Sequence, residues 1–190
     1  LAALTALTCA LVYYIGVRLH SRTAGIFAAT IFAFSYYLML ASRWLANPTP
    51  LLLTATFLLL GLFEITRGHK WWWLVVALTV GLSLQFEAAG AIWYIPTVIL
   101  FALWQRKNLP SFKILFFSFS LFLLTLLPQV LFDIRHDGIL RVAFQKFLVQ
   151  EQSFKLSFID VVKIRVPFYL GAFENIVLPA WRAFFVALLF

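Results

Sequence analysis

The chain has 190 residues, of which 64% are hydrophobic and only 12% charged, and its formal net charge is +8. Water-soluble domains are about half apolar and about a quarter charged, so the composition excludes a water-soluble domain. The positive charge does not indicate nucleic-acid binding, because most of the excess lies in short segments between apolar runs and no basic stripe is interleaved with stacking aromatic residues. Nucleic acid is therefore not an expected partner.

Six apolar runs follow one another along the chain. They cover residues 1–17, 24–41, 49–66, 71–86, 88–104 and 114–132. At about 1.5 Å per residue, helices of about 16–19 residues cross most or all of a hydrocarbon core about 30 Å thick. The run 24–41 shows no polar face at helical spacing, as a soluble bundle would require. The pattern predicts six transmembrane helices.

Lys and Arg mark every second boundary between these runs. The seven basic residues at those boundaries are Arg18, Arg22, Arg67, Lys70, Arg106, Lys107 and Lys113. The boundaries in between contain only Arg43 and Glu87 as charged residues. Short cytoplasmic loops are enriched in Lys and Arg, so this asymmetry predicts the orientation. The cytoplasmic loops are expected at 18–23, 67–70 and 105–113, and the outer segments at 42–48 and 133–165.

The pattern of apolar and charged residues changes after Phe132. Apolar and charged residues interleave in 139–148 and again in 158–166, which is typical of amphipathic helices lying in the membrane interface. Another apolar run starts near Ala180. Because both ends of the chain are apolar and the first residue is Leu1, we expect a fragment of a longer protein.

The expected fold class is all-α: a polytopic transmembrane bundle of about six to seven helices with outer interfacial amphipathic helices. The expected organisation is a six-helix transmembrane region at 1–132, an extracytoplasmic or interfacial segment at 133–178, and the start of a further transmembrane helix at 179–190. Pro96 and Pro128 fall inside apolar runs and are expected to kink their helices. Trp71, Trp72 and Trp73 predict an aromatic anchor at the membrane interface.

Glu87 and Gln85 lie at the predicted outer hairpin between the fourth and fifth helices. Ionisable groups at membrane depth are costly and usually face a cavity. One interpretation is a cavity carboxylate that binds a sugar hydroxyl or a cation, or that holds a basic partner. The other is a solvated hairpin tip. Both side chains can line one cavity only if the helix ends or unwinds near Phe86, which Gly90 would allow.

Arg43 and Asn47 form a second candidate pair, one turn apart at the outer interface. A guanidinium is well suited to a phosphate or pyrophosphate, although Arg43 could also serve as a lipid-headgroup anchor.

Arg135 and His136 lie between Asp133 and Asp137 at the exit of the sixth helix. They are candidate substrate-binding residues, and the alternative is that Arg135 simply pairs with one of the two Asp residues. A metal site is not favoured, since one His with nearby Asp is a weak ligand signal. No cofactor is expected, and a divalent metal is possible but unsupported.

Four stretches resemble membrane glycosyltransferases of the GT-C superfold, in the group of protein O-mannosyltransferases and aminoarabinose lipid A transferases. They are GVRLHSRTAGIFAATIFAFSYYLMLASRW, ANPTPLLL, GLSLQFEAAGAIWYIP and LPQVLFDIRHDG. The resemblance implies a multi-pass integral membrane enzyme of the bacterial plasma membrane. Such an enzyme moves a sugar from a polyprenyl-phosphate donor to a lipid, glycan or protein acceptor on the extracytoplasmic side, with membrane lipids around it.

By the same resemblance, the carrier phosphate would meet basic groups such as Arg43 or Arg135, and its tail would lie in a groove between helices. The general base of such enzymes would be an acidic residue upstream of Leu1, so the catalytic residue is unknown from this chain. Asn47 stands where many members carry an Asp, which puts an acid/base role of that loop in doubt. The alternative functions are a transporter or flippase for lipid-linked or anionic solutes, and an accessory subunit without activity.

Overall fold

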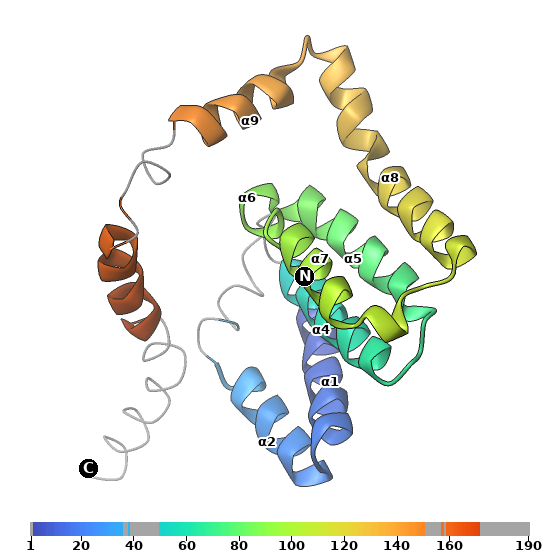
Figure 1. Ribbon diagram of the computed structural model, residues 1–190. Coiled ribbons are helices and arrows are strands. Elements are labelled where there is room, and N and C mark those ends of the chain that lie inside the picture. Colours follow the sequence, from blue (N-terminus) through green and yellow to red (C-terminus); the bar gives the residue numbers. More distant parts are fainter. Residues whose placement is uncertain (1, 36–37, 39–49, 151–156, 158, 172–190) are drawn as a thin grey trace. The chain divides into compact units, whose positions relative to one another are not determined.

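The computed structural model describes residues 2–35, 38, 50–150, 157 and 159–171, and all of their regular structure is helical. The helices are α1 (Ala2–Leu19), α2 (Arg22–Ala33), α4 (Leu51–Thr66), α5 (Trp72–Phe86), α6 (Ala88–Ala91), α7 (Tyr94–Trp104), the 3₁₀ turn η1 (Arg106–Asn108), α8 (Phe112–Arg135), α9 (Ile139–Gln150), and a helix at 159–171 (Figure 1). The chain divides into two units. Unit 1 comprises 1–33 and 38–128, and unit 2 comprises 34–37 and 129–190.

The expected all-helical class is confirmed for the described residues, but two of the six predicted runs differ. The helix expected over 24–41 ends at Ala33, and most of the rest of that run lies outside the described residues. The helix expected over 88–104 is divided by a turn at Ile92 and Trp93. Pro96 therefore lies in the first turn of α7, where its missing N–H costs no hydrogen bond. The backbone stays right-handed helical through Ile92 and Trp93, and the kink expected at Pro96 stays a prediction.

Two described helices are long and apolar enough to cross a membrane, namely α1 and α8. The other apolar helices of unit 1 are shorter than 18 residues. Most side chains of α8 are exposed, including many large apolar ones, which a folded soluble helix of this length would bury. The chain is an integral membrane protein. The number of membrane spans stays a prediction, and so does the division of the chain into segments 1–132, 133–178 and 179–190.

The core of unit 1 lies mainly between α4 and α5, which run antiparallel around the turn at 67–71. The buried cluster consists of Leu58, Ile65, Trp73, Val76, Val80, Leu84, Ala91 and Ile114. Trp73 was expected with Trp71 and Trp72 to form an interfacial anchor. It is instead buried, and its indole Nε1 donates a hydrogen bond of 3.0 Å to the main-chain oxygen of Asn108. Only Trp71 of the three is exposed.

Helices α1 and α2 form a close antiparallel pair. A Cβ added to Gly16 would stand 2.6 Å from the Cα of Gly25, so the two backbones meet at these glycines. The start of α2 is fixed by Ser21, whose hydroxyl accepts a hydrogen bond of 3.2 Å from the N–H of Ala24. Small residues at a helix crossing permit this approach and are common between membrane helices.

The three basic turns of unit 1 gather at one end. The guanidinium of Arg67 donates to the carbonyl of Arg18, which joins the end of α1 to the turn after α4. The amide of Asn108 donates to the carbonyl of Thr66, which adds the turn after α7. The expectation that these turns share one side is therefore supported by contacts, and the N-terminus of α1 and the C-terminus of α5 lie at the opposite end. We call these the basic end and the opposite end of unit 1.

The longer segment of unit 2 begins in the last part of α8. The carboxylate of Asp133 accepts hydrogen bonds of 2.7 and 3.3 Å from the N–H groups of Leu140 and Arg141, and so caps α9. The turn between the helices carries Asp137 and Gly138 at positive φ. Helices are present at both stretches where amphipathic ones were expected after residue 138, as α9 and as the helix at 159–171. Their place at the membrane interface stays a prediction. The helix expected from Ala180 lies outside the described residues.

Candidate functional site

The opposite end of unit 1 carries Gln85 and Glu87. Helix α5 ends at Phe86, and Glu87 has an extended backbone (φ −152°, ψ 84°) between α5 and α6. The break that would let both side chains line one cavity is therefore present. It does not use Gly90 in the expected way, because Gly90 lies inside α6 and is not among the residues with positive φ.

Glu87 is half-buried and held through its main chain. Its N–H donates to the carbonyl of Ser83 at 2.9 Å, and its carbonyl accepts from the N–H of Ala91 at 3.0 Å. Its carboxylate makes no capping bond to α6, nor a hydrogen bond or ion pair with another described residue. A half-buried carboxylate without a partner among the described residues is available to an external donor such as a hydroxyl or a cation.

Below this break, a buried hydroxyl pair joins α5 to α4. Ser83 Oγ donates to Thr54 Oγ1 at 2.7 Å, and Thr54 Oγ1 itself donates to the carbonyl of Leu51 at 3.2 Å. Because Ser83 also accepts the N–H of Glu87 through its carbonyl, the pair ties the backbone that carries Glu87 to the beginning of α4. Sequence reasoning did not identify this pair, since Ser and Thr in an apolar run have no distinguishing spacing.

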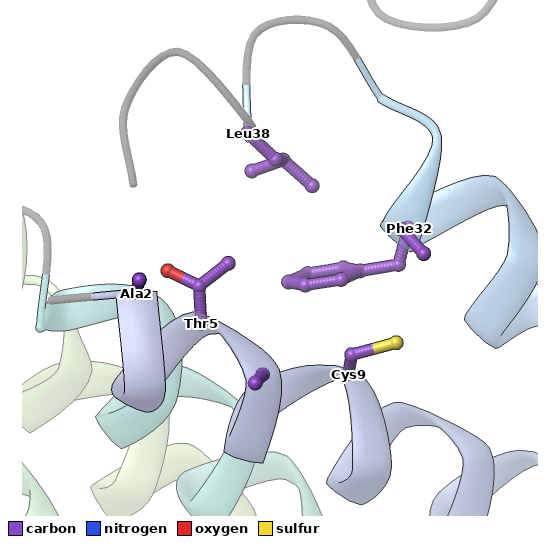
Figure 2. A pocket seen from close by; sticks show the side chains of 7 residues that line it. Ala2, Thr5, Cys9, Phe32 and Leu38 are labelled. Atoms are coloured by element: carbon purple, nitrogen blue, oxygen red, sulfur yellow. The ribbon is translucent and has the colours of Figure 1, made fainter. Parts of the chain in front are cut away.

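An apolar cavity of about 360 Å³ lies at the same end of unit 1, between α1 and α2 (Figure 2). It is lined by Ala2, Thr5, Ala6, Cys9, Phe32, Ala33 and Leu38. Small side chains on α1 leave the space, and Phe32 and Leu38 form the facing wall (Figure 2). None of its lining residues is charged, so the cavity suits a hydrocarbon group. Gln85 and Glu87 are not among its lining residues.

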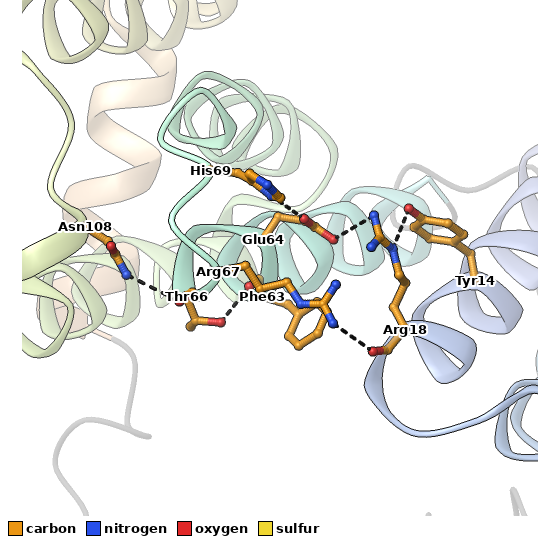
Figure 3. Close-up of polar contacts among 8 residues, drawn as sticks. All are labelled: Tyr14, Arg18, Phe63, Glu64, Thr66, Arg67, His69 and Asn108. Carbon is orange, nitrogen blue, oxygen red and sulfur yellow. Dashed lines mark hydrogen bonds and ion pairs between the residues drawn. The ribbon is translucent and has the colours of Figure 1, made fainter.

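The basic end contains a buried carboxylate that sequence reasoning missed. Glu64, in the last turn of α4, is 2% exposed. Its Oε2 lies 2.7 Å from Nδ1 of His69, and its Oε1 lies 3.5 Å from the guanidinium of Arg18 (Figure 3). Arg18 also donates to the hydroxyl of Tyr14 at 2.9 Å. The signal was available: a lone acid inside the run 49–66 needs a partner at membrane depth.

The other candidate residues lie in unit 2 or outside the described residues. Arg135 and His136 lie in unit 2 and are exposed. His136 Nδ1 lies 2.8 Å from the carbonyl of Phe132, and its ring stacks on the Phe132 ring at 4.0 Å. Within the described part of the chain, no ion pair joins Arg135 to a carboxylate. Arg43 and Asn47 lie outside the described residues. No described group of three or more His, Cys, Asp or Glu residues could hold a metal.

Residues 1–132 match the family model of the dolichyl-phosphate-mannose-protein mannosyltransferases. The chain belongs to this family. The members are membrane glycosyltransferases, so the predicted enzyme class is confirmed at this level. No curated protein and no solved structure matches the chain.

The match ends at the last apolar run of unit 1 and leaves most of unit 2 outside it. The family membership therefore bears on the helices that carry Gln85, Glu87 and the apolar cavity. It gives no role to Arg135 or His136, whose assignment as substrate-binding residues stays a prediction.

Proposed function

We propose that this chain is part of a membrane glycosyltransferase that takes a sugar from a polyprenyl-phosphate carrier and transfers it to a lipid, glycan or protein acceptor on the extracytoplasmic side. The observation that supports the proposal most is the family match over 1–132, which covers the segment holding the apolar cavity and the half-buried Glu87. The sugar and the acceptor are left open.

The arrangement of unit 1 supports an extracytoplasmic location for the reaction. All seven basic residues of the short turns lie at the basic end, and loops of this kind face the cytoplasm. The cavity and Glu87 lie at the opposite end, which then faces outward. A lipid carrier in the outer leaflet would meet these groups there without crossing the bilayer.

The cavity and the candidate site residues have different roles in this proposal. The cavity between α1 and α2 takes part of the isoprenoid tail, because its lining is uncharged and mostly hydrocarbon. Arg43 meets the carrier phosphate, since a guanidinium binds phosphate oxygens with two parallel hydrogen bonds. Glu87 accepts a hydrogen bond from a sugar hydroxyl, and Gln85 and Asn47 add neutral hydrogen-bonding groups. Arg135 and His136 remain candidates for the phosphate or the acceptor.

The cavity gives a direct test, with the full-length enzyme reconstituted in vesicles. The change Ala6→Phe would fill the cavity from α1, and Ala10→Phe adds the same bulk at an exposed position of α1 that does not line it. We expect Ala6→Phe to raise the KM for a long-chain carrier while leaving the KM for a short-chain carrier unchanged. An unchanged long-chain KM in Ala6→Phe, or the same rise in Ala10→Phe, would contradict a tail site here.

A further inference from the structure

The basic end of unit 1 presents a surface that the proposed reaction does not use. Its basic residues Arg18, Arg22, Arg67, Lys70, Arg106, Lys107 and Lys113 are all exposed. Glu64 is the one acidic residue at this end within the described part of the chain, and it is buried beneath the surface against Arg18 and His69. The outward charge of this end is therefore strongly positive and is not balanced by neighbouring carboxylates.

Two of the seven cations already have partners in the protein. Arg18 is held by Glu64 and Tyr14. Arg67 donates to the carbonyl of Arg18 and lies 4.6 Å over the ring of Phe63. These contacts fix the ends of α1 and α4, so the function of these two guanidinium groups is structural.

Three of the remaining five cations, Lys70, Arg106 and Lys107, are brought together by contacts between the turns. Trp73 and Asn108 are hydrogen-bonded, and Asn108 also reaches Thr66, so the turn that holds Lys70 is fixed against η1, which holds Arg106 and Lys107. Among the described residues, the side chain of Arg106 reaches only the carbonyl of Leu103. Neither Lys70 nor Lys107 forms an ion pair with a described carboxylate. We call these three residues the cationic surface.

Exposed tryptophans mark the membrane depth of this surface. Trp71 is 68% exposed and Trp104 is 74% exposed, and each is within two residues of a member of the cationic surface. Exposed Trp in membrane proteins lies at the level of the lipid headgroups. A cluster of Lys and Arg at that level, on the side where the positive loops lie, meets anionic headgroups and is attracted by them.

We propose that Lys70, Arg106 and Lys107 bind the headgroups of anionic phospholipids in the cytoplasmic leaflet. All phospholipids carry a phosphate group. Only the anionic ones carry a net negative charge. Selectivity arises because three cations on a fixed surface are attracted to a net negative lipid and not to a zwitterionic one, whose own positive group they repel. The binding is independent of the sugar donor, which meets the opposite end of unit 1.

The test uses the full-length protein in detergent, titrated with phosphatidylglycerol or with phosphatidylcholine, with the retained lipid counted by native mass spectrometry. The triple variant Lys70→Gln, Arg106→Gln and Lys107→Gln removes the cationic surface. The matched control, Lys146→Gln, Lys163→Gln and Arg165→Gln, removes the same charges from exposed positions of unit 2. Each variant is also titrated with inorganic phosphate as competitor.

We expect the wild-type protein and the unit 2 control to prefer phosphatidylglycerol, and the triple variant to lose about 10- to 100-fold of that preference. An unchanged preference in the triple variant would overturn the proposal. Equal losses in both triple variants would show an effect of net charge alone and would also overturn it. Displacement of the lipid by millimolar inorganic phosphate would identify a small-anion site, which contradicts a site for lipid headgroups.

Discussion

The carboxylate of Glu64 and the imidazole of His69 are joined at 2.7 Å, although Glu64 is 2% exposed and the His69 side chain is 59% exposed. The contact spans the end of α4 and the turn that follows it, and Arg18 adds a second helix from the other side. A buried carboxylate without partners would be costly in a low-dielectric environment. Glu64 therefore joins α1, α4 and the turn at 67–71, alongside the hydrogen bond from Arg67 to the carbonyl of Arg18.

We predict that Glu64→Ala lowers the stability of the protein in detergent by about 2 kcal/mol. Breaking a fully buried ion pair costs about 3–5 kcal/mol, and the loss here is smaller because Arg18 and His69 are partly exposed and regain water. Glu64→Gln keeps one hydrogen bond and should cost about half as much. Thermal unfolding of both variants measures this, with Glu87→Gln as the control. A Glu64→Ala protein as stable as Glu87→Gln would show that the network contributes nothing.

The glycines of α1 and α2 lead to a second prediction. In Gly25→Ala, the added methyl group would stand 2.7 Å from the carbonyl oxygen of Tyr13 and 2.7 Å from Val17 Cγ2. The helices must separate to admit it, which should cost about 1–3 kcal/mol. In Gly90→Ala, the nearest atom is Glu87 Cγ at an ordinary 3.6 Å, so stability should be unchanged or slightly higher. Equal melting temperatures of the two variants would contradict the close crossing.

The orientation in the membrane is the third prediction. In a Cys9→Ser background, single cysteines replace Lys107 at the basic end and Ala89 at the opposite end, both of which are exposed positions. A membrane-impermeant thiol reagent applied to intact cells should label position 89 and not position 107, and position 107 should become labelled after the cells are opened. Labelling of position 107 in intact cells would reverse the orientation and move the proposed reaction to the other side.

Much of the fold follows from simple physical rules applied to the sequence. Apolar runs bounded by charges predicted the helices of unit 1, because a membrane helix needs an uninterrupted apolar segment. The division of 88–104 was missed because Ile92 and Trp93 are apolar themselves and give no turn signal. Pro96 was the available indication, and it marks the start of α7.

The candidate site was harder to predict from the sequence than the fold. Gln85 and Glu87 were selected as candidates because charged and polar groups are rare in apolar runs, and their role stays a prediction. The predicted end of α5 at Phe86 is present. The cavity was not predicted in place, because it depends on how α1 and α2 pack and not on any residue spacing. The buried role of Glu64 was missed because Arg18, its partner, is 46 positions away in the sequence.

The fourth prediction concerns Arg43 as the phosphate ligand of the proposed donor site. Arg43→Ala should weaken donor use by about 1.5–3 kcal/mol, as for a lost hydrogen bond to a charged group. Arg43→Lys should recover only part, because an ammonium group cannot form two parallel bonds. Steady-state kinetics with varied donor concentration measures both variants. An unchanged donor KM in both would reduce Arg43 to an anchor at the membrane interface.

The central claim is sugar transfer at the end of unit 1 that carries Glu87, and its most direct measurement uses the full-length protein in sealed vesicles with a radiolabelled polyprenyl-phosphate sugar. The wild-type protein should move the label to an acceptor on the side opposite the basic end. Glu87→Gln keeps the shape but removes the charge, so it should insert normally and lose most of the transfer. The account is contradicted if Glu87→Gln transfers sugar at the wild-type rate, or if the labelled carrier crosses the bilayer and no acceptor is glycosylated.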